Sequence, residues 1–176
     1  SAASDVYKRQ VTISGSRLYD STTTASSSIL TITSGVSGES LSLTGSGVLG
    51  AASAGTQTIT NNNTLAIADG TGGLASNYTL SGATINVTII PRTLNVTLSR
   101  EYDGTTAVSG ASLTPTFDSL QGGETLALSG TGSVSTANVG SSKAVSLGSI
   151  ALVAGSGNPS NYSLNSATMN VTQRVI

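Results

Sequence analysis

The sequence contains no cysteine, no histidine and no tryptophan. Without cysteine it can form neither disulfides nor thiolate metal sites, and without histidine it lacks the commonest imidazole base and transition-metal ligand. Aromatic residues make up only 3% of the chain. Valine, leucine, isoleucine and alanine must therefore fill the interior, and most catalytic chemistry is absent.

Charged residues are also scarce, at 9% of 176 residues, and the formal net charge is -1. A typical globular protein has about 25% charged residues. Because the basic residues are spread singly along the chain, we expect no basic surface for phosphates and no nucleic-acid partner. The sequence has no run of about 20 apolar residues, so we expect no membrane insertion.

The first ten residues differ from the rest of the chain. They include Lys8 and Arg9, two of the seven basic residues, and they lack the apolar segment of a signal peptide. No counterpart to them is evident in the second half. We interpret residues 1–10 as a leader or a cloning scar outside the fold, and we expect the chain to be a fragment of a longer protein.

Three landmarks recur in the same order in the two halves of the chain, with a period of about 84 residues. Tyr19-Asp20-Ser21 recurs as Tyr102-Asp103-Gly104, Gly38-Glu39 as Gly123-Glu124, and Asn77-Tyr78 as Asn161-Tyr162. This duplication indicates two tandem units, which we assign to residues 11–91 and 92–176. Pro91 marks the joint, because proline cannot donate to a β-ladder.

Between the landmarks, apolar residues alternate with serine and threonine, as in Leu41-Ser42-Leu43-Thr44. A period of two is typical of half-buried strands, and no segment carries a helical pattern over three turns. We predict an all-β chain with two tandem small β-sandwich units of an immunoglobulin-like (Ig-like) kind. A β-grasp-like unit with a mixed sheet and one short helix is the alternative. We expect the last strand of the first unit over residues 83–89 and the matching strand of the second unit over residues 167–172.

Paired carboxylates are the one acid-base chemistry that this composition allows, with Asp20, Glu39, Asp103 and Glu124 as the repeated candidates. Catalytic carboxyls need surroundings that tune their pKa, and nothing in the sequence indicates such surroundings. Calcium at Asp20 or Asp103 would require further oxygen ligands, whereas an aspartate in this setting ordinarily forms a turn. We expect no enzyme, no metal ion and no cofactor.

The Asn77-Tyr78 and Asn161-Tyr162 landmarks allow two interpretations. Each ring could stack on a sugar while the amide hydrogen-bonds it. Alternatively, each tyrosine anchors the core and each asparagine bonds its own loop. We favour the second interpretation, because a core poor in aromatic residues needs its few large side chains.

Several separated motifs together resemble the YDG repeat of bacterial haemagglutinin-like surface proteins. They are Tyr102-Asp103-Gly104-Thr105-Thr106, Ala137-Asn138-Val139-Gly140 followed by Lys143, and Asn161-Tyr162-Ser163-Leu164. The first unit departs from this pattern, with Ser21 in place of the turn glycine and Ser53-Ala54-Gly55 in the loop. The resemblance implies a large exported protein of a Gram-negative bacterium, of the filamentous-haemagglutinin type, in which tandem repeats separate an adhesive region from the cell.

We therefore expect a non-catalytic structural module, a stalk or spacer, of an exported surface adhesin that lies outside the cell or on its outer surface. Its expected partners are the neighbouring repeats of the same chain. The alternative hypothesis is that the repeats themselves bind host glycans or matrix proteins weakly, with repetition supplying avidity.

Overall fold

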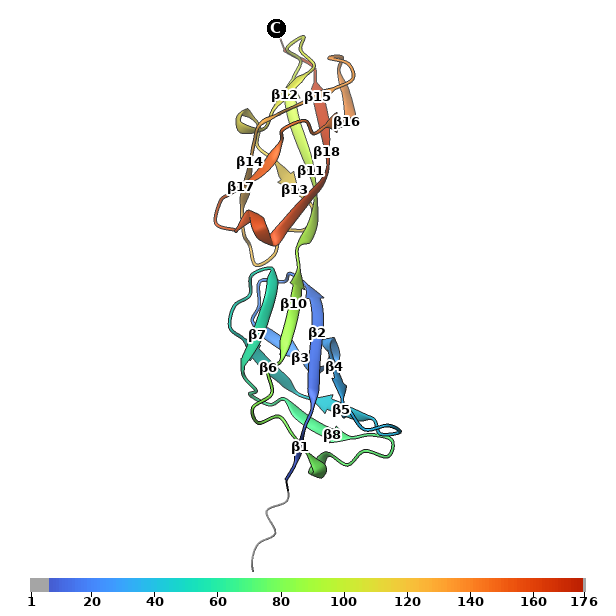
Figure 1. Cartoon of the computed structure of the whole chain (residues 1–176). Helices are drawn as coiled ribbons and strands as arrows, with labels where there is room; N and C mark the ends of the chain where they lie inside the picture. The colour runs from blue at the N-terminus through green and yellow to red at the C-terminus, as the bar shows by residue number, and fades with distance from the viewer. Residues whose placement is uncertain (1–6, 176) are drawn as a thin grey trace, which may run out of the picture. The chain divides into compact units, whose positions relative to one another are not determined.

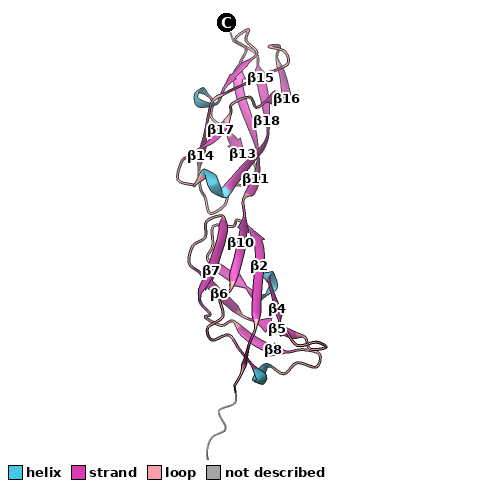
Figure 2. Ribbon diagram, viewed as in Figure 1, coloured by secondary structure: helices cyan, strands magenta, loops and turns pink. Residues whose placement is uncertain are grey.

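The computed structural model describes residues 7–175. The chain divides into unit 1, Ser1–Ile90, and unit 2, Pro91–Ile176. Over the described residues both units consist of β-strands and short 3-10 turns (Figures 1 and 2). The prediction of an all-β chain with two tandem units is confirmed. No helix in the described residues is long and apolar enough to cross a membrane.

Unit 1 contains the following elements in chain order. They are β1 (Arg9–Gln10), β2 (Thr12–Leu18), β3 (Thr24–Ser26), η1 (Ser27–Ile29), β4 (Leu30–Thr33), β5 (Leu41–Thr44), β6 (Ser46–Leu49), β7 (Gly55–Asn61), β8 (Ala66–Asp69), η2 (Ala75–Asn77), β9 (Tyr78–Thr79) and β10 (Asn86–Ile90).

Unit 2 repeats this order with fewer breaks. Its elements are β11 (Arg92–Glu101), β12 (Ala107–Ser109), η3 (Gly110–Ser112), β13 (Thr116–Phe117), β14 (Leu126–Ser129), β15 (Thr131–Val134), β16 (Gly140–Ser146), β17 (Ala151–Ala154), η4 (Pro159–Asn161) and β18 (Tyr162–Thr172).

Each unit is built on one curled six-stranded sheet. The strand order is β3-β6-β7-β10-β2-β4 in unit 1 and β12-β15-β16-β18-β11-β13 in unit 2. At the centre, the first long strand runs parallel to the last, β2 beside β10 and β11 beside β18 (Figure 1). The mixed sheet is the arrangement that the β-grasp-like alternative expects, although the described residues form 3-10 turns in place of the short helix of that alternative.

The core of unit 2 lies between this sheet and the small antiparallel sheet of β14 and β17. Leu98 of β11 and Met169 of β18 are fully buried, and Leu128 of β14 packs in the same cluster. Along β11 the aliphatic residues face the core while the polar residues between them face solvent. This alternation follows from the two-residue period of a strand, and it fills the interior with small aliphatic side chains as predicted.

Arg9 and Gln10 belong to the fold, so the assignment of residues 1–10 to a segment outside it was wrong for these two residues. Arg9 pairs with Tyr78 as Arg92 pairs with Tyr162. The guanidinium Nη2 of Arg9 also donates to the Gly35 carbonyl at 3.0 Å. The first strand of each unit therefore begins at an arginine. This equivalence of Arg9 and Arg92 is not evident from the sequence, because the residues that follow the two arginines differ. The first six residues lie outside the described part of the chain.

The expected match between the last strands was wrong by two residues. The Tyr19 amide donates to the Ile90 carbonyl and the Tyr102 amide to the Thr172 carbonyl, both at 2.9 Å. Ile90 and Thr172 are therefore equivalent, although the sequence pattern pairs Asn86-Val87-Thr88 with Asn170-Val171-Thr172. Unit 1 has extra residues between β9 and β10, whereas β18 is unbroken. Because successive side chains of a strand point to opposite faces of the sheet, a register shift of two residues leaves the same side chains facing the core.

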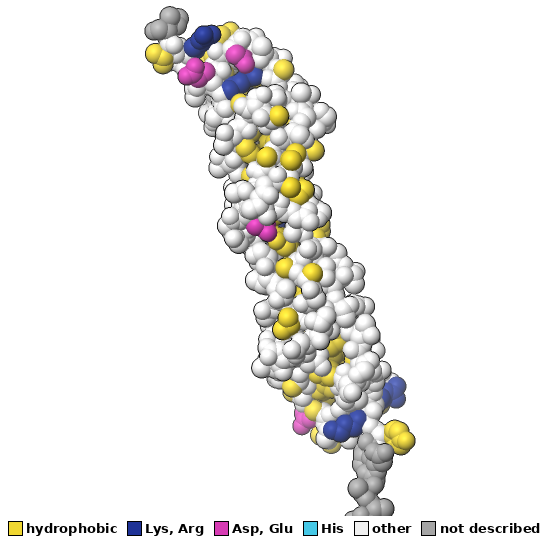
Figure 3. Space-filling view, turned by 90° about the vertical axis from the view of Figure 1, so that its left-hand side faces the viewer, with side chains coloured by type: hydrophobic (Ala, Val, Ile, Leu, Met, Phe, Trp, Pro, Cys, Tyr) yellow, Lys and Arg dark blue, Asp and Glu magenta, His cyan; other side chains and the backbone are white. Residues whose placement is uncertain are grey.

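The surface is largely polar and uncharged. On the face shown in Figure 3, few acidic or basic groups are visible, and most of the area is backbone or uncharged polar side chains with apolar side chains between them. Serine and threonine thus occupy the solvent side of the strands, as the alternating sequence predicts.

Gly130 allows a test of the turn between β14 and β15. Its φ is +77°, and a Cβ there would lie 2.0 Å from the Ser149 carbonyl oxygen. Gly123 has a similar φ of +71° but no atom within 4 Å of the same position. We expect Gly130→Ala to lower the free energy of unfolding by on the order of 3 kcal/mol and Gly123→Ala by about 1 kcal/mol. Urea unfolding followed by circular dichroism measures both, and equal losses would contradict the close approach.

Candidate functional site

The repeated Tyr-Asp motif forms a turn directly after β2 in unit 1 and directly after β11 in unit 2. Asp103 Oδ1 accepts hydrogen bonds from the backbone N–H and the hydroxyl of Thr105, both at 2.9 Å. Asp20 accepts the same two bonds from Thr22, at 2.9 and 2.8 Å. In unit 2 these bonds, chiefly the one from the Thr105 N–H, hold the pKa of the Asp103 carboxyl below its usual value. The aspartates therefore act as turn formers.

An arginine three residues before each aspartate completes the turn, and the sequence analysis missed it. Arg100 donates through Nη1 to the Ala107 carbonyl at 2.5 Å and through Nη2 to the Thr105 carbonyl, and it forms an ion pair with Asp103 at 3.3 Å. Arg17 forms the equivalent ion pair with Asp20. Both arginine side chains are nearly buried. The repeated Arg-x-x-Asp spacing was the available signal.

The turn keeps its shape with or without glycine. Gly104 has a φ of +78°, and Ser21 at the equivalent position has a φ of +63°. Glycine adopts this left-handed conformation at little cost, whereas serine is strained in it. The departure of unit 1 from the Tyr-Asp-Gly pattern therefore changes the energy of the turn and leaves its geometry intact.

The other two landmarks, Gly-Glu and Asn-Tyr, meet in each unit. The Tyr162 hydroxyl donates to Glu124 Oε2 at 2.5 Å and accepts from the Gln121 N–H at 3.0 Å. In unit 1 the Tyr78 hydroxyl donates to Glu39 Oε2. Both rings are about 5% exposed, so neither offers a face on which a sugar could stack. The sequence analysis recognised both landmarks and missed this bond, which joins residues far apart in the chain.

The Tyr–Glu bond alters the ionisation of the tyrosines. Burial, followed by the hydrogen bond to Glu124, raises the pKa of Tyr162 above its ordinary value. The hydrogen bond to Glu39 is the main cause that raises the pKa of Tyr78. Both tyrosines therefore stay neutral through the physiological pH range.

The asparagines that precede the two tyrosines differ in exposure, since Asn161 is buried and Asn77 is exposed.

The structure does not bring the carboxylates of unit 2 together. Asp103 lies two residues after the end of β11, whereas Glu124 is hydrogen-bonded to Tyr162, which pairs with the first residue of β11. At about 3.3 Å per residue, a ten-residue strand separates the two ends by about 30 Å. Within residues 7–175, no three histidine, cysteine, aspartate or glutamate side chains gather as metal ligands would.

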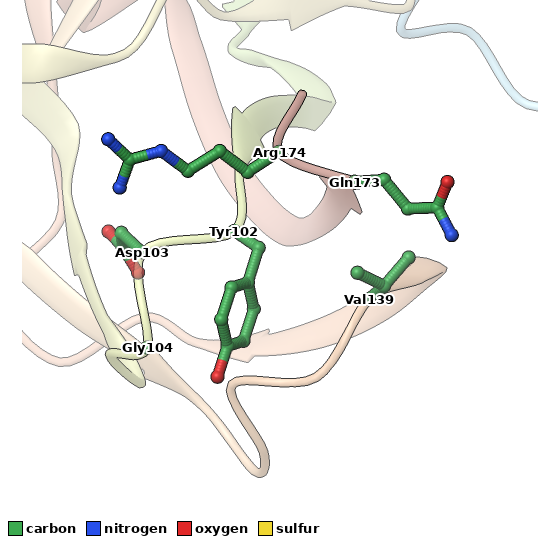
Figure 4. A pocket seen from close by; sticks show the side chains of 6 residues that line it. All are labelled: Tyr102, Asp103, Gly104, Val139, Gln173 and Arg174. Carbon is green, nitrogen blue, oxygen red and sulfur yellow. The ribbon is translucent and has the colours of Figure 1, made fainter. Parts of the chain in front are cut away.

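An open hollow of about 490 Å³ lies at the carboxyl end of unit 2. It is lined by Tyr102, Asp103, Gly104, Val139, Gln173 and Arg174. Figure 4 shows the Tyr102 ring between the Asp103 turn and Val139, with Arg174 on the Asp103 side and Gln173 on the Val139 side. The hollow thus joins the Tyr-Asp-Gly motif to the Ala-Asn-Val-Gly loop, a proximity that the sequence analysis did not predict.

Lys143 holds the Val139 loop in place. Its Nζ donates to the carbonyls of Thr136 and Asn138 at 2.5 and 2.6 Å. In unit 1, Gln57 Nε2 donates to the Ser53 carbonyl at 3.0 Å. Different side chains at the equivalent position therefore tie down the same loop.

The two tyrosines of the Tyr-Asp motif differ in exposure. Tyr19 is 3% exposed and Tyr102 is 41% exposed. Tyr102 borders the open hollow together with Asp103 and Gly104.

The fold and these repeated contacts define a tandem-repeat protein built from two similar all-β units. The chain matches the YDG domain model twice, over residues 7–87 and 86–169, and it belongs to the YDG domain family. No curated protein and no solved structure matches the chain.

The Tyr162 hydroxyl provides a direct test of the bond between the landmarks. Tyr162→Phe leaves Glu124 and the Gln121 N–H without this partner, so we expect it to lower the free energy of unfolding by about 1–2 kcal/mol. Tyr102→Phe, at an exposed ring, is the matched control and should change stability by less than about 0.5 kcal/mol. Urea unfolding at neutral pH measures both.

A comparison of the unsubstituted protein with Tyr162→Phe tests the raised pKa of the Tyr162 hydroxyl. A pKa raised in the folded state gives stability that is complete below the unfolded value of 10.0 and is lost as pH rises through the folded value. The unsubstituted protein should therefore lose stability above pH 10 more steeply than Tyr162→Phe. A stability difference that stays constant through this range would show that the tyrosine proton is not involved.

Proposed function

We propose that the two YDG units form a non-catalytic structural spacer of an exported bacterial surface adhesin. In this role they lie outside the cell and hold a binding region away from it. The parallel pairing of the first and last strand of each unit carries the proposal, because a spacer between a cell and its target bears tension.

In unit 2, β11 and β18 pair from Arg92 with Tyr162 to Glu101 with Thr172. Because the strands are parallel, the first residue of β11 and the last residue of β18 lie at opposite ends of the ladder. Tension along the chain therefore pulls the two strands past each other, and it loads all the backbone hydrogen bonds of the ladder together. In unit 1, β2 and β10 pair in the same direction.

The repeated motifs also support a structural role. The turn at Asp103 closes one end of the ladder, and the bond between Tyr162 and Glu124 closes the other. Asp103, Tyr162 and Glu124 therefore each have a hydrogen-bond partner inside unit 2. A spacer needs such internal contacts in every repeat, and a catalytic site would need reactive groups that converge.

Force spectroscopy tests the spacer, because introduced cysteines are the only thiols in this cysteine-free chain. Handles on Thr93→Cys and Thr172→Cys pull the ladder in shear, whereas handles on Thr93→Cys and Ser163→Cys open it from one end. All three positions are exposed. We expect the shear geometry to require a rupture force several times that of the opening geometry, because bonds then break together and not in sequence.

The two protein variants share one ladder and differ only in where force is applied, so each controls for the other. Handles are coupled under reducing conditions, because Thr93 and Ser163 are paired neighbours. Equal rupture forces in the two geometries would remove the mechanical basis of the proposal.

A further inference from the structure

Apolar side chains are exposed around the hollow at the carboxyl end of unit 2. Val139 and Tyr102 line the hollow, and Val175 follows Arg174 directly. Val139 is 50% exposed, and Val175 is still more exposed. In Figure 4 the Tyr102 ring and the Val139 side chain border the same open space. On a surface otherwise rich in serine and threonine, such a group indicates a contact surface.

The register of the two units shows which residues follow this surface. Since Ile90 is equivalent to Thr172, Pro91 and Arg92 correspond to Gln173 and Arg174. Arg92 is the first residue of β11. A further unit joined with the same spacing would begin its first strand at position 174, at the rim of the hollow.

Unit 1 carries exposed apolar side chains at its amino end. Arg9 binds the Gly35 carbonyl, which places Val36 beside β1. Leu74 directly precedes η2, which leads into Tyr78, the partner of Arg9. Leu74 is 55% exposed and Val36 is 36% exposed. An amino end of this kind offers apolar groups to match Tyr102 and Val139.

The surface is too small for a stable interface with a separate protein. Six residues line the hollow, whereas a stable interface between separate proteins buries more than about 1,000 Å². A partner joined through one residue is present at an effective concentration in the millimolar range, so a small contact is then sufficient. A protein that contacts this surface stably is therefore one that is covalently attached.

We propose that the surface around Tyr102 and Val139 binds the amino end of a further YDG unit joined at position 173. This proposal rests on the spacer function, because contacts between successive units would limit bending at each joint. It adds a binding surface and its partner to that function.

A single introduced thiol tests the contact. Val139→Cys is made in the two-unit chain and in an extended chain, in which residues 8–90 follow Thr172 so that Arg9 takes the place of Arg174. We expect the thiol to react with a maleimide at least about tenfold more slowly in the extended chain, because reaction requires an accessible thiolate. Val153→Cys, at a side chain that is 39% exposed on β17, should react equally in both chains.

A Leu74→Asp change in the appended unit should restore most of the reactivity, since it places a charge in the apolar contact. Equal reactivity of the Val139→Cys thiol in the two chains would overturn the proposal, as would protection that Leu74→Asp leaves unchanged. Circular dichroism and the urea midpoint check that the appended unit is folded. A ladder that resists shear, together with a Val139→Cys thiol that stays reactive in the extended chain, would retain the spacer and remove this contact.

Discussion

The parallel ladder between the first and last strands is the interaction on which each unit depends. In unit 2, β11 and β18 occupy the centre of the six-stranded sheet, and their buried faces supply Leu98 and Met169 to the core. The ladder joins the two ends of the unit's sequence, so its formation must offset the entropy lost when the long intervening segment is closed into a loop. Long-range pairing of this kind is entropically expensive and makes the unit cooperative.

The family motifs secure the two ends of this ladder. At one end, Arg100 and Asp103 fix the turn after β11, and at the other end Tyr162 and Glu124 fix the entry into β18. In a domain of about 85 residues with few aromatic groups, the apolar core alone gives a modest margin of stability. Polar contacts that are satisfied inside each unit therefore explain why these residue types recur in both copies. The Tyr102 end of unit 2 also borders an open, partly apolar hollow.

The sequence predicted the features that depend on local pattern. Alternating residues identified strands and buried faces, and the Asp-Gly signal identified the turn at Asp103. The direction and order of the strands could not be predicted, because alternation specifies a face and not a neighbour. For the same reason the sequence could not predict the two-residue shift that makes Ile90 equivalent to Thr172. The Tyr162–Glu124 bond joins distant segments, whereas the Arg100 contact was within reach of a local reading, since Arg-x-x-Asp occurs in both copies.

Native-state hydrogen exchange measures the central claim most directly. If the parallel ladder holds the unit together, the amides of β11 and β18 exchange only through global unfolding, and they share the highest protection in unit 2. The amides of β14 and β17 then exchange through smaller openings. Protection in β14 and β17 that equals or exceeds protection in β11 and β18 would contradict the account, because the small sheet would then persist after the central ladder had opened.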